Sequence, residues 1–230
     1  MNSLLKPIPQ RETLGDHVFQ QIKEILLTGK VMPGELLSLR STAEALGVSM
    51  TPVRQAVYQL VADHALEVAP NRSVRVPILS ASQFREITTI RLEVEGFAVA
   101  QAVPLATHEL IASLRTLNQS LAGQMDAGGS ALGEAILLNK QLHFSLYAAS
   151  GMPMLVKIIE SLWLRIGPIL NYDLRSGSAR TRNKTAVAHH EAMIAALERG
   201  DGAAARQALH DDIESAYRYI TDQRYSELLS

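Results

Sequence analysis

The chain has 230 residues, of which 47% are hydrophobic and 20% are charged, the composition of an ordinary globular protein. Its 22 Lys and Arg residues face 23 Asp and Glu residues, and the formal net charge of -1 excludes a polycationic tail or a generally basic nucleic-acid coat. The absence of Cys excludes a disulfide framework, thiolate zinc sites and cysteine nucleophiles.

The first part of the chain predicts three helices and a hairpin. In the helical segments, apolar residues recur at three- and four-residue spacing, which describes one buried stripe on each helix. We expect the hydroxyl of Ser49 to cap the third helix, with Pro52 in its first turn. The predicted elements are helices from Gly15 to about Gly29, over 41–46 and from Ser49, and then strands over 66–68 and 74–76.

The second part of the chain predicts helices only, because no segment after residue 80 alternates as a strand does. Ser80 or Ser82 is expected to cap the first of them. The predicted helices cover 82–103, 107–127, 131–150, 153–171, 181–199 and 202–222, separated by Gly and Pro. Since the length exceeds the roughly 150-residue prior for one domain, we expect a mainly α protein with one domain over 1–78 and an all-helical bundle over 79–230.

The segment 43–54 joins two short helices through a turn that contains Gly47, the geometry of a helix-turn-helix. The second helix of such a unit presents its first turns to the major groove of DNA, and Ser49, Thr51 and Arg54 lie on those turns. Arg54 is the strongest candidate, because its guanidinium group can bond guanine or phosphate. The alternative is that the helices only pack a small domain and that Arg54 is a solvated surface charge.

The predicted hairpin adds a second basic element. Its tip at 71–73 contains Arg72, and Arg75 follows, so the hairpin is a candidate wing that contacts the DNA backbone or minor groove. Solvated surface charges are again the alternative. One copy of such a domain binds DNA weakly, so the sequence implies a homodimer on a double-stranded operator.

The run over 33–76 resembles the winged-helix domain of the GntR family of bacterial transcription regulators, especially in its LGVS-x-TPVR-x-A core. The chain departs from the family pattern at Leu39, Met50 and Ser73, so the operator sequence does not follow by analogy. The resemblance implies DNA contacts from Arg40, Ser49, Thr51, Arg54 and Arg72.

Four polar residues interrupt the apolar stripes of the predicted bundle. Asn139 and His143 are four residues apart and point inward from one helix face. His190 and Asp212 lie at matching distances from a predicted turn after Gly200, and so at the same height in the bundle. Buried groups of this kind are costly unless paired, and their atoms suit a divalent cation such as Zn, Ni, Mn or Fe. The alternative is a hydrogen-bonded His–Asp pair without metal.

The segment over 80–222 resembles the FCD ligand-binding domain of the FadR-type branch of the same family. The matching pieces are Arg91-x-x-x-Glu95, Asn139-x-x-x-His143-Phe144, His190-Glu191 and Gly200-Asp201. Metal-binding members carry Asp or Asn and three His, which map onto Asn139, His143, His190 and, in the last position, Asp212. The nearby His210 is two residues away, and two residues rotate a helical side chain by about 200°, away from the seam.

Arg91 lies on the inward stripe of the 82–103 helix. The resemblance implies a carboxylate effector, which Arg91 would bind with two parallel hydrogen bonds. An ion pair with Glu95 inside the helix is the alternative. Trp163 is expected to be a core residue rather than a platform for the ligand.

Three functions follow from these features. The first is a homodimeric transcription regulator that senses a small organic acid and changes the separation or mobility of two winged helices. The second is a metal-dependent helical enzyme with an accessory amino-terminal module, which the lack of a HExxH motif disfavours. The third is a structural interaction module. Because 1–17 lacks the core of a signal peptide and no stretch approaches the ~20 apolar residues of a membrane span, we expect a cytoplasmic protein without membrane contact.

Overall fold

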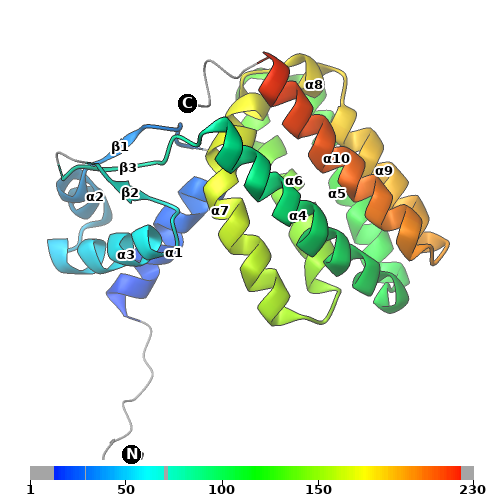
Figure 1. The fold of residues 1–230 in the computed structure, drawn as a ribbon, viewed down its shortest axis with the longest axis horizontal. Helices are drawn as coiled ribbons and strands as arrows, with labels where there is room; N and C mark the ends of the chain where they lie inside the picture. The colour runs from blue at the N-terminus through cyan, green and yellow to red at the C-terminus, as the bar shows by residue number, and fades with distance from the viewer. Residues whose placement is uncertain (1–12, 29, 70–71, 224–230) are drawn as a thin grey trace, which may run out of the picture.

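A computed structural model of the chain describes residues 13–28, 30–69 and 72–223. Figure 1 shows a small part, with three helices and a three-stranded sheet, beside a larger helical bundle. The mainly α class, with a winged helix-turn-helix followed by a helical bundle, is therefore confirmed. Within the described part of the chain, no helix combines the length and the apolar character needed to cross a bilayer.

The helices of the small part are α1 (Leu14–Leu27), α2 (Leu39–Leu46) and α3 (Met50–Ala62). Ser49 is the N-cap residue of α3, but the prediction that its hydroxyl caps the helix is wrong. An N-cap side chain bonds the second or third N–H of its helix, and the third residue of α3 is Pro52, which has no N–H. The hydroxyl of Ser49 thus stays exposed at the start of α3.

The sheet contains β1 (Leu36–Leu37), β2 (Glu67–Val68) and β3 (Val74–Arg75) in the antiparallel order β1-β3-β2. The hairpin of β2 and β3 was predicted, whereas β1 was not. Two residues are too few to show the alternation that identifies a strand in a sequence. Asn71, at the predicted tip, lies outside the described residues.

The helices of the bundle are α4 (Ala81–Ala102), α5 (His108–Ala127), α6 (Leu132–Ala148), α7 (Pro153–Arg175), α8 (Ala179–Arg182), α9 (Thr185–Glu198) and α10 (Gly202–Gln223). Ser80 caps α4 in a capping box with Gln83, as predicted. The predicted single helix over 181–199 is wrong, because Lys184 adopts a left-handed conformation, with φ of 53°, and separates α8 from α9. Helix α7 continues past the predicted end and contains Pro168.

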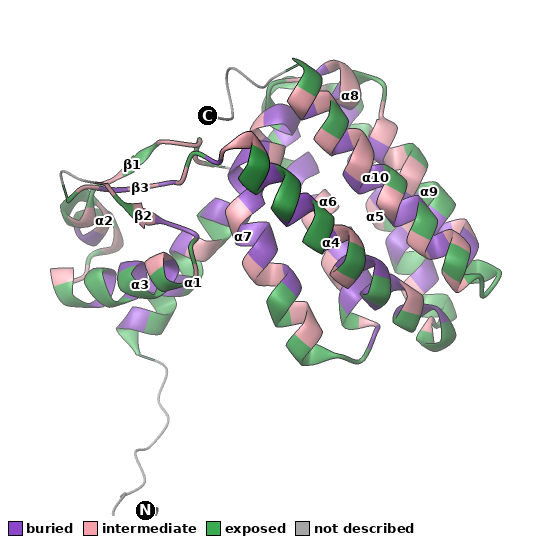
Figure 2. Cartoon of the chain, in the orientation of Figure 1, coloured by how far each residue is buried: buried purple, intermediate pink, exposed green. Residues whose placement is uncertain are grey.

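Helix α7 connects the two parts of the molecule, because it packs against α1 as well as against the bundle (Figure 1). The Asn171 side-chain amide donates to the main-chain oxygen of Leu27 at 2.9 Å. A Cβ atom added to Gly167 would lie 3.0 Å from the oxygen of Leu26, so only Gly lets the helices come this close. The buried residues drawn in Figure 2 line this junction and the interior of the bundle.

Candidate functional site

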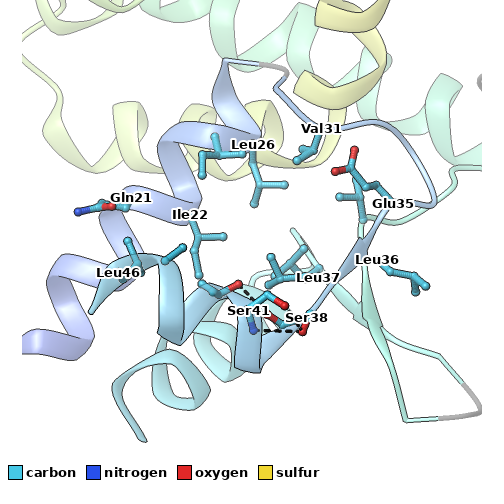
Figure 3. A pocket seen from close by; sticks show the side chains of 15 residues that line it. Gln21, Ile22, Leu26, Val31, Glu35, Leu36, Leu37, Ser38, Ser41 and Leu46 are labelled. Carbon is cyan, nitrogen blue, oxygen red and sulfur yellow. Dashed lines mark hydrogen bonds between the residues drawn. The ribbon is translucent and has the colours of Figure 1, made fainter. Parts of the chain in front are cut away.

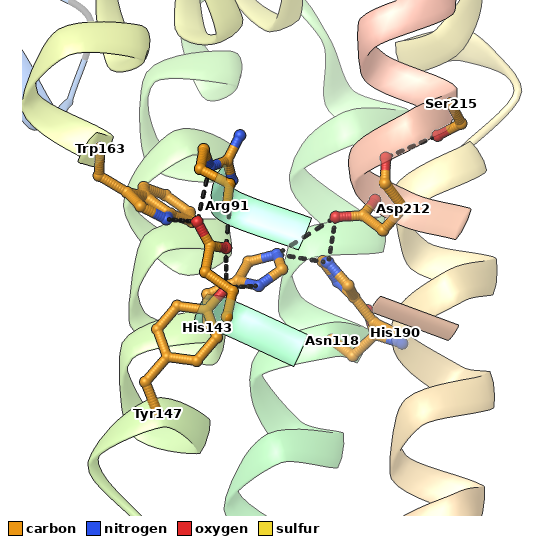
Figure 4. Close-up of polar contacts among 9 residues, drawn as sticks. Arg91, Asn118, His143, Tyr147, Trp163, His190, Asp212 and Ser215 are labelled. Atoms are coloured by element: carbon orange, nitrogen blue, oxygen red, sulfur yellow. Dashed lines mark hydrogen bonds and ion pairs between the residues drawn. The ribbon is translucent and has the colours of Figure 1, made fainter. Parts of the chain in front are cut away.

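Three of the predicted metal ligands converge inside the bundle, each from a different helix (Figure 4). His143 on α6 and His190 on α9 bring their Nε2 atoms to 3.1 Å. An oxygen of Asp212 on α10 lies 3.4 Å from Nε2 of His143 and 3.9 Å from Nε2 of His190. All three residues are buried. His190 and Asp212 thus meet at the height that the sequence predicted.

A hydrogen bond sets the orientation of the His190 ring. Its Nδ1 atom lies 3.1 Å from Oδ1 of Asn118, whose amide nitrogen donates to the main-chain oxygen of Val187. The Asn118 oxygen can only accept, so Nδ1 of His190 carries the proton. In a neutral ring, Nε2 then presents a lone pair to His143 and Asp212.

The ring of His143 is oriented in the same way. Its Nδ1 atom lies 3.1 Å from the hydroxyl of Tyr147, which itself donates to Glu95. The Tyr147 oxygen is therefore the acceptor, and Nδ1 of His143 is protonated. The lone pairs of both Nε2 atoms and the carboxylate of Asp212 thus converge on one point. Only a cation at that point can interact favourably with all three groups.

That cation is either a proton or a metal ion. A proton on Nε2 of His143 gives a hydrogen-bonded His–His–Asp cluster, the alternative without metal. However, it leaves the second oxygen of Asp212 buried and without a hydrogen-bond partner in the part of the chain that the structure describes. A divalent cation suits two imidazoles and a carboxylate, and the Asn118 and Tyr147 partners are the outer contacts that metal-bound histidines make. The residues present therefore fit a metal.

Electrostatics keep these side chains in the forms that bind a cation. Burial is the main influence on His190 and lowers its pKa to about 3, so the ring is neutral at neutral pH. Burial opposes the negative charge of Asp212. In the metal-free cluster, hydrogen bonding from His143 and nearby positive charge, including that of Arg180, outweigh this effect and hold the pKa of Asp212 below its ordinary value.

A cavity of about 30 Å³ is lined by His143 and Asp212, whereas His190 is not part of its lining. This volume holds about two water molecules. Asn139, the fourth predicted ligand, lies one turn before His143 and lines the cavity, so it remains a candidate. The cavity is also lined by Arg91, Trp163, Gly167, Asn171 and Arg180.

Arg91 forms an ion pair with Glu95 inside α4, which was the alternative to binding an effector. Its Nε and Nη2 atoms donate to the two oxygens of Glu95 at 2.6 and 3.2 Å, and both residues are buried. Glu95 also accepts from Tyr147 and from Nε1 of Trp163. Arg91 lines the cavity, but its charge is already matched. Trp163 is buried as expected and also forms part of the cavity wall.

His210 does not join the cluster. Its Nε2 atom lies 2.8 Å from the main-chain oxygen of Leu92, on the side of α10 that packs against Gly96 of α4. The two-residue offset from Asp212 thus rotates it away, as helix geometry predicts.

Two residues that position the rings were missed by the sequence reasoning. Asn118 interrupts the buried stripe of α5, between Leu114 and Leu121, in the same way that His190 interrupts α9. Tyr147 follows His143 by four residues on one face of α6. Both spacings can be read from the sequence, but the role of these residues in orienting the rings follows only from their hydrogen bonds to His190 and His143.

The predicted DNA-contacting residues lie on the surface of the small part. Ser49, Thr51 and Arg54 are exposed on the first turns of α3, while Val53 and Val57 are buried beneath them. Arg40 is 85% exposed and pairs with Glu44 at 2.9 Å. These positions leave the amino-terminal turns of α3 open to a DNA groove.

The two Arg residues of the wing differ in their surroundings. Arg72 is exposed and has a left-handed backbone, with φ of 64°. Arg75 follows on β3, where its side chain is 37% exposed and pairs with Glu67 across the hairpin at 2.6 Å, as Arg40 pairs with Glu44.

A second cavity, of about 390 Å³, lies in the small part between α1, β1 and α2 (Figure 3). Apolar side chains such as Ile22, Leu26, Leu37 and Leu46 line most of it. It leaves α2 less tightly packed against α1 than α3 is.

We expect the ring-orienting residues to tune metal affinity. Tyr147→Phe removes the acceptor of His143, and Asn118→Ala removes that of His190, so each variant should bind Zn²⁺ 10–100-fold more weakly. Competition with a chromogenic chelator measures this affinity. Tyr217→Phe is the control, because Tyr217 lies against Phe84 and Arg85. Wild-type affinity in both test variants would contradict the assignment.

Comparison with protein-family models gives two matches. The model described as bacterial regulatory proteins, gntR family, matches residues 14–76, and the model of the FCD domain matches residues 86–215. Together they cover the winged helix and most of the bundle.

Known proteins of this type are similar over nearly the whole chain. The HTH-type transcriptional regulator McbR of Escherichia coli (strain K12) is 35% identical over 206 residues, which is 90% of this chain and 92% of that protein. The solved structure of E. coli McbR/YncC has a TM-score of 0.84 and 33% identity, and covers 93% of this chain and 99% of that one. A putative GntR regulator from Rhodococcus sp. RHA1 has the same fold, with a TM-score of 0.74 at 19% identity, over 91% of this chain and 98% of that one.

Proposed function

The chain belongs to the GntR family of bacterial regulatory proteins, in the FadR-type branch with an FCD domain, and from this we propose that its bundle senses a small carboxylate at a metal site. It is a ligand-responsive DNA-binding transcription regulator. The alternative of a metal-dependent enzyme has no support, because the relatives of this chain are transcriptional regulators. The observation that carries the proposal is the convergence of His143, His190 and Asp212 in a domain joined to a winged helix.

His143, His190 and Asp212 would hold the metal, with Asn139 as the fourth candidate. A divalent cation such as Zn, Ni, Mn or Fe would supply a positive charge that attracts an anionic effector. The chain's own contribution is to keep both Nε2 atoms free of protons through Asn118 and Tyr147. The low pKa of His190 and of Asp212 supports this role.

Operator binding would use Arg40, Ser49, Thr51, Arg54 and Arg72. Arg54 would contact base edges or phosphates in the major groove, and Arg72 the adjacent backbone or minor groove. We propose a homodimer on a two-half-site operator, because one winged helix offers few contacts. The cytoplasm is the proposed location, since the operator lies there.

The two domains would communicate through α7. Gly167 and Asn171 line the cavity and, on the same helix, contact Leu26 and Leu27 at the end of α1. A ligand that binds one arrangement of α7 better than another shifts the position of α1, and a coupling of about 1–3 kcal/mol is sufficient.

A gel shift tests the proposed function. DNA from upstream of the gene is titrated with the protein, with Zn²⁺ or with a chelator. We expect a shift that excess unrelated DNA does not compete away, with an affinity that depends on the metal. If the protein shows no preference for any upstream fragment, the proposed function is wrong.

Asn171→Leu is expected to weaken the effect of Zn²⁺ binding on DNA affinity without changing Zn²⁺ binding itself. The variant loses the hydrogen bond to Leu27, so its Zn²⁺ affinity should stay within about twofold of wild type while the Zn²⁺-dependent change in DNA affinity falls severalfold. Asn183→Leu, at an exposed position after α8, is the matched control. An unchanged response in Asn171→Leu would exclude this route.

A further inference from the structure

Arg165, on α7, was not a predicted site residue. Its Nε atom is buried and has no hydrogen-bond partner among the described residues, and its guanidinium group forms no ion pair with any of them. Arg91 provides the contrast, because Glu95 accepts from two of its nitrogens. A buried charged donor without an acceptor is costly, so the surroundings of Arg165 call for an explanation.

Arg165 lines a third cavity, of about 120 Å³, at the place where the winged helix and the bundle meet. We call it the junction cavity. The winged helix contributes His64, Leu66 and Glu67 to its lining, the connecting segment contributes 77–79, and the bundle contributes Gln83 and Arg165. It shares no described lining residue with the cavity beside the metal ligands. Its volume holds about eight water molecules, which is enough for a phosphate or sulfate ion.

The polar groups of the junction cavity favour an anion. Oε1 of Gln83 accepts from the N–H of Ser80 in the capping box of α4, which leaves the amide N–H groups of Gln83 to donate. Glu67 is the one carboxylate among the described lining residues, and Arg75 neutralises it at 2.6 Å. The positive charge of Arg165 is therefore not compensated, and an oxyanion is the acceptor that a guanidinium group binds best.

We infer that the junction cavity binds a free oxyanion of the size of phosphate, with Arg165 and Gln83 donating to its oxygens. Such an anion satisfies the buried Nε atom of Arg165 and offsets its charge. It also connects α7 to the segment between the domains and to the winged helix, so its binding favours one placement of the two domains over others. This site is separate from the proposed metal site and does not depend on it.

The position of the junction cavity argues for a free anion rather than a phosphate group of the operator. Helix α3 is expected to enter the DNA groove with its first turn, which starts at Met50. Its last residue, Ala62, lies about 18 Å farther along the helix axis, and the cavity begins beyond it at His64. Arg165 therefore lies on the side of the winged helix that faces away from the DNA, and inorganic phosphate is the simplest probe.

Isothermal titration calorimetry on the full chain measures the binding of sodium phosphate, with sodium chloride at the same ionic strength as the reference. We expect saturable binding of one phosphate per chain, and a higher unfolding temperature in phosphate than in chloride. Arg165→Gln should raise the Kd for phosphate at least tenfold. Arg175→Gln, at an exposed position at the end of the same helix, is the matched control and should bind phosphate as wild type does.

Gln83→Glu tests the site with a variant that keeps the start of α4 intact. Glu replaces Gln in a capping box, so the Ser80 cap is retained. The added negative charge at the cavity should raise the Kd for phosphate at least tenfold. Because Gln83 is exposed, this variant decides the question even if Arg165→Gln fails to fold, which circular dichroism would show.

Several results would overturn the inference. They are the absence of saturable phosphate binding by wild type, an equal response to chloride, or wild-type phosphate affinity in a folded Arg165→Gln or Gln83→Glu variant. Weaker binding of a DNA duplex by Arg165→Gln in phosphate-free buffer, without phosphate binding by wild type, would assign Arg165 to the DNA backbone instead. None of these measurements involves Zn²⁺, so their failure is distinct from a failure of the proposed function.

Discussion

His143→Ala and His190→Ala should each lower the affinity for Zn²⁺ by on the order of 100-fold or more, because loss of an outer contact alone costs 10–100-fold. Each substitution removes one of two imidazoles whose Nε2 atoms lie 3.1 Å apart. Metal analysis of the purified proteins and chelator competition measure the effect. His108→Ala, at an exposed position at the start of α5, is the control.

DNA binding by the metal-free protein should survive in the same variants, because the substituted residues lie in the bundle and not on the winged helix. Circular dichroism would establish that each variant folds. A metal content equal to wild type in both variants would show that His143 and His190 bind no metal. The hydrogen-bonded cluster without metal would then be the correct description.

Arg54→Ala should lower operator affinity by about 5–150-fold for each subunit in contact, since a bidentate contact to a base contributes ~1–3 kcal/mol. The exposed Arg54 side chain contributes little to the core beneath α3, so the melting temperature should not change. Fluorescence anisotropy with a labelled operator measures the affinity.

Arg199→Ala is the matched control for charge, because Arg199 is exposed at the far end of α9. A general loss of positive charge would weaken both variants equally and change the salt dependence alike. A base contact instead weakens only Arg54→Ala and relaxes the preference for the operator. Unchanged binding would remove α3 from the DNA interface.

Much of the fold can be predicted from the periodicity of apolar residues, and the predictions that were wrong have local causes. The helical bundle was predicted because each helix buries one stripe. The break at Lys184 was not predicted, because the sequence after Thr181 keeps the helical pattern on both sides of this single left-handed residue. Ser49 does not cap α3, because Pro52 removes the N–H of the third position and the Ser49 hydroxyl does not bond the Thr51 N–H instead.

The candidate site was predictable where it depends on helix geometry. Equal distances from the turn after Gly200 placed His190 beside Asp212, and the structure brings them together. Arg180 was not predictable, because nothing in the pattern indicates that a short helix after α7 turns this side chain into the cavity. Long-range pairing of that kind depends on tertiary packing rather than on spacing.

Pro168 has a consequence for how α7 moves. It follows Gly167 in the sequence and has no N–H, so the main-chain oxygen of Leu164 lacks its usual helical donor. Bending α7 at this point breaks fewer main-chain hydrogen bonds than bending it elsewhere. Because Pro168 lacks an N–H in every state of the protein, this missing hydrogen bond weakens α7 whether or not DNA, a cation or an acid is bound.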